Sequence, residues 1–331
     1  MGIASDVPDL ISDVYHFKEM VSNTTKPIVF TAWNRQNLED IIEMARVVAG
    51  GKEEHQRNPF CALYSEPIAP LVHGTDSSNK LLFIAAEGLP IVYTPGSMQG
   101  ASSPVTMAGT LTQANAELPS GILIIQLIRE GTPVFGGGGV MSMDMATGQV
   151  AYSTPEFMLA LAALTEIYHY YKLPVFSFAG VSDSKNDQQA GAEGAIWMLL
   201  AALCGGNLIH DVGYIEAGLT TSFEVLVSMD EIAGFVKYLL RGIDINEETL
   251  ALDVIDRVGP GGHFLSEEHT LRNFKSNWFP KLFDIQNLQS WELKNKLTLG
   301  DRSREKVRKI INRLVLDYEQ RRWCAGDKRK Q

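Results

Sequence analysis

The sequence predicts an α/β fold, namely a TIM-type (β/α)8 barrel with about six strands visible in this chain, plus a C-terminal helical segment. Three observations predict it. Short β-rich runs alternate with helical patterns, as in βα units around a parallel sheet. The runs are continuously apolar, which suits strands covered on both faces. No GxGxxG motif follows any of them, which disfavours an open nucleotide-binding sheet.

Six segments have the composition of buried strands, and each ends in turn-forming or polar residues. They are residues 27–33, 59–65, 89–94, 132–136, 173–179 and 207–212. A barrel of this type has eight strands. We therefore expect a barrel portion over residues 1–225 that lacks its first strands.

The helices between these strands carry start and stop signals. Ser153 and Glu156 form a predicted capping box, with Pro155 in the first turn. Asp187 can cap the helix that runs to Leu203, and Gly205 and Gly206 are a fitting stop. For the glycine-rich segment 135–140, we expect a loop in which backbone passes close to a ligand.

The βα pattern stops beyond Asp211. Residues 226–331 are predicted to be C-terminal helices and a turn-rich segment, which holds His263 and His269, packed on the barrel. The two histidines lack a third ligand at sensible spacing, which disfavours a metal site.

Composition excludes several classes of protein. The net charge of -10 is spread along the chain, and basic residues concentrate only near the C-terminal helix, so nucleic acid is not an expected partner. The start has no signal-peptide pattern, and the most apolar run, residues 195–203, is too short to span a bilayer. A cytoplasmic protein with no membrane partner is expected. Cys61, Cys204 and Cys324 form no CxxC motif, which disfavours a zinc-thiolate site.

Aromatic residues gather at the predicted carboxyl ends of the strands, where a TIM-type barrel places its active site. A ring of π-faces is what a cationic ammonium ligand needs, each contributing about 0.5 to 2 kcal/mol. The alternative is that these rings pack under helices. The residues are Trp33, Tyr64, Tyr93, Phe135, Phe178 and Tyr214.

Polar residues occur at the same level and are candidates for orienting a substrate. They are Glu66, Gln99, Asp183, Lys185, Glu216 and, from the turn-rich segment, His263. Asp183 is also a natural turn residue, and Lys185 is equally explained as a solvated surface charge. His210 lies inside a predicted strand, where a core role is the simpler interpretation. No catalytic residue is assigned.

Three blocks of sequence together resemble one family. They begin "GASSPVTMAGTLTQANAELPSG", "STPEFMLALAALTEIYHYY" and "GPGGHFLSEEHTLRNF". In this order, over nearly all of residues 1–285, the chain is similar to the trimethylamine methyltransferase (MttB-like) family. The resemblance implies a barrel that moves a methyl group from a methylated amine to the cobalt of a corrinoid (cobalamin) carried by a partner protein. No cofactor would be bound directly.

The resemblance also bears on the substrate. The founding branch of the family carries pyrrolysine in the stretch that matches Lys185 and Asn186, whereas this chain has standard residues there. The resemblance therefore implies the branch without pyrrolysine, and a quaternary amine such as glycine betaine in place of trimethylamine. The enzyme would hold the N-methyl carbon in line with the cobalt and exclude water.

One departure leaves alternatives open. Family members are longer at the N-terminus, so the chain is expected to be a fragment or to complete its barrel otherwise, for instance as a homo-oligomer. A non-catalytic protein that binds the ligand or the corrinoid protein is the main alternative. A lyase or aldolase with Lys185 as a Schiff-base amine is another.

Overall fold

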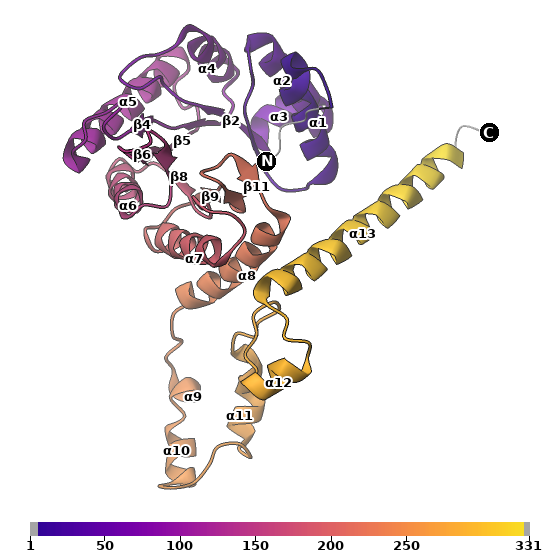
Figure 1. Cartoon of the computed structure of the whole chain (residues 1–331). Coiled ribbons are helices and arrows are strands. Elements are labelled where there is room, and N and C mark those ends of the chain that lie inside the picture. Colours follow the sequence, from indigo (N-terminus) through magenta and orange to yellow (C-terminus); the bar gives the residue numbers. More distant parts are fainter. Residues whose placement is uncertain (1–5, 328–331) are drawn as a thin grey trace. The chain divides into compact units, whose positions relative to one another are not determined.

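The computed structural model describes residues 6–327, with side chains through residue 314. It divides into two compact units, Met1–Ser222 (unit 1) and Phe223–Gln331 (unit 2), which Figure 1 colours from indigo to orange and from orange to yellow. No described helix has both the length and the apolar character needed to cross a membrane.

The main sheet of unit 1 has six strands among the described residues, all parallel and ordered as they follow along the chain. It curls into part of a barrel, which confirms the predicted α/β, TIM-type fold class (Figure 1). Each of the six predicted segments contains one strand. The strands are β1 (Ile28–Phe30), β2 (Cys61–Ser65), β3 (Ile91–Tyr93), β5 (Val134–Gly137), β8 (Val175–Phe178) and β9 (Leu208–His210).

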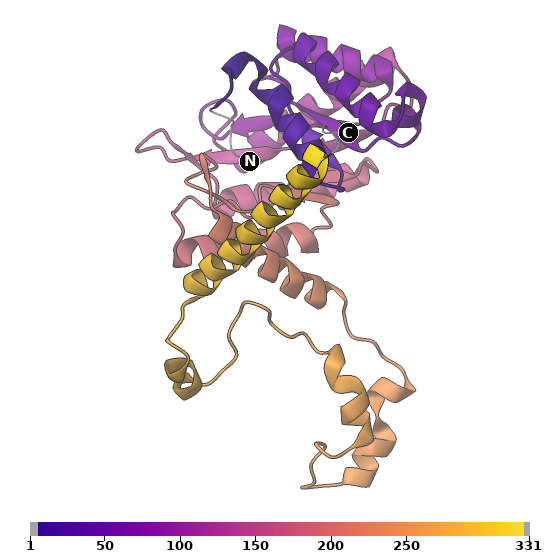
Figure 2. The same ribbon diagram turned by 90° about the vertical axis from the view of Figure 1, so that its right-hand side faces the viewer.

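Helices alternate with these strands and cover one face of the sheet, as Figure 2 shows. Alternation along each strand separates the two faces. Leu63 and Ile91 belong to the large core under the helices, whereas Ala62, Val92 and Phe176 form a smaller cluster on the inner face. The helices are α1 (Ser12–Asn23), α2 (Arg35–Ala49), α3 (Lys52–Arg57), α4 (Thr75–Glu87), α5 (Met107–Ile128), α6 (Pro155–Tyr170) and α7 (Gln188–Leu203).

The predicted helix starts are correct in one case and displaced in the other. The Asp187 carboxylate caps α7 by accepting the backbone N–H groups of residues 189 and 190, as predicted. At α6 the predicted Ser153–Glu156 capping box is wrong, because Thr154 is the capping residue and accepts the N–H of residue 157. The Ser153 hydroxyl instead donates to the carbonyl of Val181, 2.8 Å away.

The glycine-rich segment is not the loop that the sequence suggested. It continues from β5 into β6 (Gly139–Met143), which joins β4 (Gly96–Met98) and β7 (Val150–Ala151) in a second sheet. Gly138 has a φ of 124°, and a Cβ there would lie 2.5 Å from the carbonyl oxygen of Pro95. The glycine therefore allows protein backbone to approach protein backbone. A small hairpin, β10 (Tyr214–Ile215) and β11 (Thr220–Thr221), follows β9.

Unit 2 is helical. Its helix α8 packs against α13, visible in Figure 2, with the buried hydroxyl oxygens of Ser228 and Ser303 2.8 Å apart. Two short helices, α9 and α10, follow α8 along the chain. The helices are α8 (Phe223–Leu240), α9 (Glu247–Leu250), α10 (Leu252–Val258), α11 (Glu268–Asn273), α12 (Leu288–Leu293) and α13 (Leu299–Asp327).

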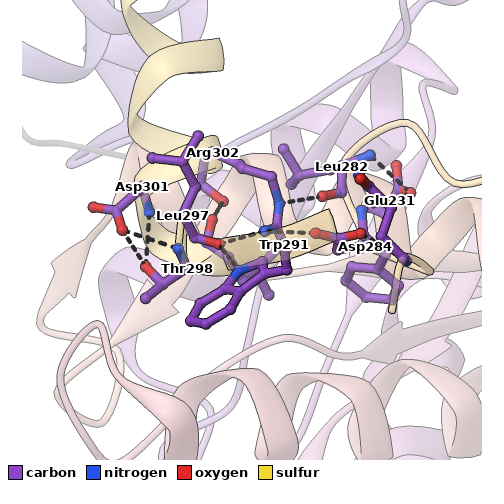
Figure 3. A network of polar contacts seen from close by, with 12 residues as sticks. Glu231, Leu282, Asp284, Trp291, Leu297, Thr298, Asp301 and Arg302 are labelled. Atoms are coloured by element: carbon purple, nitrogen blue, oxygen red, sulfur yellow. Dashed lines mark hydrogen bonds and ion pairs between the residues drawn. The ribbon is translucent and has the colours of Figure 1, made fainter. Parts of the chain in front are cut away.

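A polar network fixes a segment without regular secondary structure within unit 2 (Figure 3). Glu231 Oε1 accepts the backbone N–H groups of residues 281–283, at 2.7, 3.0 and 3.3 Å. Arg302 donates from Nε to the carbonyl of Leu282 and from Nη1 to that of Leu297, both at 2.7 Å. Backbone polar groups that no helix or strand pairs are thus satisfied by one acid and one base.

Candidate functional site

A continuous row of five rings runs in unit 1 from Phe176, within β8, to the carboxyl ends of the strands. Neighbouring ring centroids are 6.1 Å apart from Tyr64 to Phe176, 3.9 Å from Phe176 to His210, 5.4 Å from His210 to Phe178, and 5.5 Å from Phe178 to Tyr152. The His210 ring stacks on Phe176 with 9° between the planes. We call these five residues the aromatic row.

The fold explains why these rings meet. Phe176 and Phe178 are two residues apart in β8, so both side chains point to the same face of the sheet. His210 is the last residue of β9 and pairs with Phe178, and Tyr64 is next to last in β2 (strands labelled in Figure 1). Parallel strands bring these ends to one edge, where a TIM-type barrel carries its chemistry. Tyr152 reaches the same edge from the segment between β7 and α6.

Two carboxylates lie beside the aromatic row. The Tyr64 hydroxyl donates to Glu66 Oε2 at 3.2 Å, and His210 Nδ1 lies 2.9 Å from Asp211 Oδ1. Burial, with the charges of both carboxylates, raises the pKa of the Tyr64 and Tyr152 hydroxyls. The phenols of the row are therefore neutral and lie in a negative electrostatic environment, which attracts a cation.

Glu66 has its own perturbed environment. Its side chain is exposed, yet protein atoms surround it on several sides, and this partial loss of solvent raises its pKa. The hydrogen bond from Tyr64 and the charge of Lys80 oppose the shift. Burial lowers the pKa of Lys80, whose Nζ donates to the carbonyl of Ala32.

The Asp183 carboxylate is not a free charge beside the aromatic row, because both of its oxygens accept hydrogen bonds. Its oxygens accept the backbone N–H groups of Tyr152 and Ser153 at 2.8 and 2.7 Å. The arrangement makes it a residue that holds the chain segment carrying Tyr152. Lys185, two residues later, is exposed.

Other residues that the sequence singled out lie apart from the row. Tyr93 is on the helix-covered face, 1% exposed, with its hydroxyl oxygen 3.1 Å from Nδ1 of His73. Burial raises the Tyr93 pKa. Phe135 is on the inner face and packs with the cluster beneath the row. The Gln99 amide donates to the carbonyl of Val105 in the loop before α5.

The remaining candidates lie near the β10–β11 hairpin or in unit 2. Tyr214 is half-buried in β10, and burial together with the charge of Asp211 raises its pKa. Glu216 is exposed and accepts the Thr220 hydroxyl at 2.8 Å. His263 is exposed in unit 2. The Cys324 side chain lies outside the described ones.

Sequence reasoning missed Phe176, Tyr152 and Asp211 and interpreted His210 as a core residue. The sequence did contain a signal for Phe176 and His210. Each lies an even number of residues from another side chain at the same end of its strand, and side chains at that spacing point to the same face of the sheet. No signal marked Tyr152, since it follows a hairpin that the sequence did not predict. Asp211 has a φ of 63°, which the sequence does not reveal for a non-glycine residue.

The chemistry open to this edge is recognition of a cation by π-faces and carboxylates. Among the side chains that the structure describes, residues 6–314, no group of three or more His, Cys, Asp and Glu is arranged to hold a metal ion.

Comparison with known proteins places the chain. A model of the trimethylamine methyltransferase family matches residues 3–320. The chain is 31% identical over 318 residues to a glycine betaine methyltransferase of Desulfitobacterium hafniense, covering 95% of this chain and 66% of that protein. It is 32% and 33% identical to trimethylamine methyltransferases of D. hafniense and Methanosarcina barkeri, over 86% and 90% of this chain and 58% and 61% of those proteins.

The chain thus spans 58 to 66% of the length of these three relatives. The match runs through both units and includes every residue of the aromatic row. The chain belongs to the trimethylamine methyltransferase family.

Proposed function

We propose that the chain is a methyltransferase that moves a methyl group from a quaternary, or tertiary, methylamine such as a betaine to cob(I)alamin of a corrinoid protein. The observation that carries this proposal is the aromatic row with Glu66 and Asp211 beside it. The names of the relatives support the reaction class and the two amines.

The aromatic row supplies what binding of a quaternary ammonium requires. Such a cation has no N–H to donate, so it is held by ring faces and by diffuse negative charge. Tyr64 and Tyr152, at the two ends of the row, offer phenol rings, and the carboxylates of Glu66 and Asp211 balance the positive charge. Each well-placed face contributes about 0.5 to 2 kcal/mol.

The chemistry then depends on orientation. Cob(I)alamin, carried by the partner, supplies the nucleophile for the methyl carbon. The amine nitrogen keeps the electron pair of its broken C–N bond, so a quaternary amine leaves neutral and needs no proton. The residues of this chain hold the ammonium and keep water from the N-methyl group.

Exposed apolar side chains on the loops that follow the strands support a protein partner at this edge. Ile68 and Leu71 follow β2 and are 58% and 64% exposed, and Leu219 in the β10–β11 turn is 87% exposed. Large exposed apolar side chains on loops are candidate contacts for a protein partner. A corrinoid protein docked there brings its cofactor to the aromatic row.

The substrate is proposed to be a quaternary amine because Lys185 and Asn186 are standard residues where the founding branch carries pyrrolysine. The test follows the conversion of cob(I)alamin to methylcobalamin by absorbance, with glycine betaine, choline, carnitine and trimethylamine as donors. We expect turnover with at least one quaternary amine and the least with trimethylamine. Absence of turnover with every donor would refute the proposal.

A non-catalytic role is the second candidate. It is favoured by the main sheet, which has six strands among the described residues where a closed barrel has eight. Calorimetry that shows betaine binding, together with no methyl transfer under reducing conditions, would identify a protein that binds the ligand without transforming it.

A further inference from the structure

Tyr152 belongs to the aromatic row, although no pattern in the surrounding sequence predicts this position. Its ring stacks on Phe178 with 16° between the planes, and its centroid is 5.7 Å from that of Phe157. A Cβ placed on Gly218 would lie 3.9 Å from Tyr152 Cζ, so the hydroxyl end of the ring lies beside the β10–β11 turn. The ring is only partly buried and retains exposed surface.

The electrostatic environment of Tyr152 is that of a cation-binding ring. After burial, the largest contribution to its raised pKa is the charge of Asp211, followed by those of Glu66 and Asp183. The negative charges of three carboxylates from three different segments therefore act on this phenol, and one of them, Asp183, also accepts the backbone N–H of Tyr152. A packing residue of the core needs no such surroundings, whereas a bound ammonium ion gains from all of them.

The backbone at Tyr152 is fixed from two sides. Asp183 accepts its N–H and that of Ser153. Ser153 in turn accepts from the indole N–H of Trp197 at 3.2 Å and donates to the carbonyl of Val181. The segment before α6 is thereby tied to the segment after β8.

Asp183 itself is held by Glu193 of α7. The Glu193 Oε2 atom accepts the Ser182 hydroxyl at 2.5 Å and the N–H of Asp183 at 3.1 Å. Gln189 donates to Oε1 of the same carboxylate at 2.7 Å. A chain of contacts thus runs from α7 through Asp183 to the ring of Tyr152.

We propose that Tyr152 is a substrate-contacting residue that selects the positive charge of the amine, and that Asp183 is a positioning residue acting through it. This assignment rests on the proposed function. It gives the polar segment after β8 a defined role, since Asp183 fixes the ring that meets the substrate. Packing in the core is the competing explanation for Tyr152.

The test measures charge selectivity by calorimetry on the full chain. The probes are glycine betaine and 3,3-dimethylbutanoate, which replaces the ammonium nitrogen by carbon and keeps the carboxylate. In Tyr152→Leu we expect the ratio of the two affinities to fall about tenfold. Tyr152→Phe keeps the ring face and is expected to stay within about twofold of wild type.

A double-mutant cycle tests the positioning role. In the wild-type background, Asp183→Ala is expected to lower the ratio of the betaine affinity to the 3,3-dimethylbutanoate affinity severalfold. In the Tyr152→Leu background it is expected to leave that ratio unchanged. Asp183→Asn keeps one acceptor oxygen and serves as a second variant if the alanine variant does not fold. Amide hydrogen exchange at Tyr152 and Ser153 is expected to accelerate in both. Asp144→Asn, an exposed turn carboxylate that also accepts a backbone N–H, is the control and should change neither readout.

The outcomes separate this assignment from the proposed function. If wild type binds betaine more tightly than 3,3-dimethylbutanoate and Tyr152→Leu keeps the same affinity ratio, the role of Tyr152 is refuted and the proposed function stands. Equal losses for Asp183→Ala in both backgrounds refute positioning through Tyr152. If wild type binds no quaternary amine, the proposed function is refuted and this assignment with it.

Discussion

Asp183 in unit 1 and Glu231 in unit 2 make the same kind of contact in different settings. Each carboxylate accepts consecutive backbone N–H groups of a segment without regular structure, two for Asp183 and three for Glu231. Glu231 is 5% exposed, and the Leu282 side chain in the segment it holds is 4% exposed. Asp183 is partly exposed, and so is Tyr152 in the segment it holds.

The difference lies in what the held segment carries. The segment that Glu231 holds carries the buried side chain of Leu282, so the contact serves the interior of unit 2. The segment that Asp183 holds carries the Tyr152 ring, which is one end of the aromatic row. Identical hydrogen-bond chemistry therefore maintains a core in one place and a candidate binding surface in the other.

The largest expected effect comes from removing the buried carboxylate. Glu231→Ala leaves three N–H groups without their acceptor, and we expect unit 2 to lose about 3 kcal/mol of unfolding free energy. Urea unfolding followed by circular dichroism measures this loss. Binding of a quaternary amine to unit 1 should be unchanged.

Asp230 provides the matched control. It precedes Glu231 in α8, its side chain is 77% exposed, and its partner is Lys306 at 3.5 Å. Asp230→Ala should cost less than about 1 kcal/mol, as for other surface ion pairs. Equal losses in the two variants would contradict a structural role for the Glu231 contact.

The corresponding change in unit 1 is predicted to be smaller. Asp183→Ala should destabilise unit 1 by about 1 to 2 kcal/mol, because water reaches the two N–H groups that it leaves. The same urea titration, read for unit 1, measures it. If Asp183→Ala lost more unfolding free energy than Glu231→Ala, the prediction would be wrong. The main role of Asp183 would then be to stabilise the fold of unit 1.

Tyr64, at the opposite end of the aromatic row from Tyr152, is expected to act on affinity alone. Tyr64→Ala should weaken quaternary-amine binding by about 1 kcal/mol, from loss of one ring face. Calorimetry measures it, with Tyr64→Phe as the control that keeps the face and loses the hydrogen bond to Glu66. Phe178→Ala is a poorer probe, since Phe178 is 6% exposed and its truncation also leaves a cavity. Unchanged affinity in a folded Tyr64→Ala would remove Tyr64 from the site.

The sequence predicted the strands and which residues end them, because apolar runs and turn residues act locally. It placed Tyr64 and Phe178 correctly at the carboxyl ends of their strands. It could not separate Tyr93 from them, since a shift of one residue moves a side chain to the other face and the run around Tyr93 is apolar on both. Tyr93 therefore lies under the helices.

Tyr152 and Asp183 show a different limit. Their contact joins residues 31 positions apart, across α6 and β8, and Tyr152 directly follows β7, a strand of only two residues. From the sequence, Asp183 was interpreted as a substrate ligand or a turn residue. The structure shows instead that its carboxylate oxygens accept two backbone N–H groups. Long-range hydrogen bonds of this kind leave no periodic trace along the chain.

The smallest expected effect concerns Glu66, an exposed acid beside the row. Its raised pKa means that it becomes neutral at a higher pH than an ordinary glutamate does. Attraction for a cation is present above this pKa and is lost as pH falls through it. We expect choline, whose charge does not change over this range, to bind about twofold to threefold more weakly after that loss, since solvent screens the charge.

Glu66→Gln isolates the contribution of the Glu66 charge. The variant should bind choline at neutral pH as weakly as wild type does once Glu66 is protonated. The difference between the two proteins should vanish at low pH, because Glu66 is then neutral in both. By linkage, bound choline should lower the Glu66 pKa in wild type. A difference that stays constant with pH would mean that the glutamine alters the Tyr64 ring position, and that the charge of Glu66 has no part in binding.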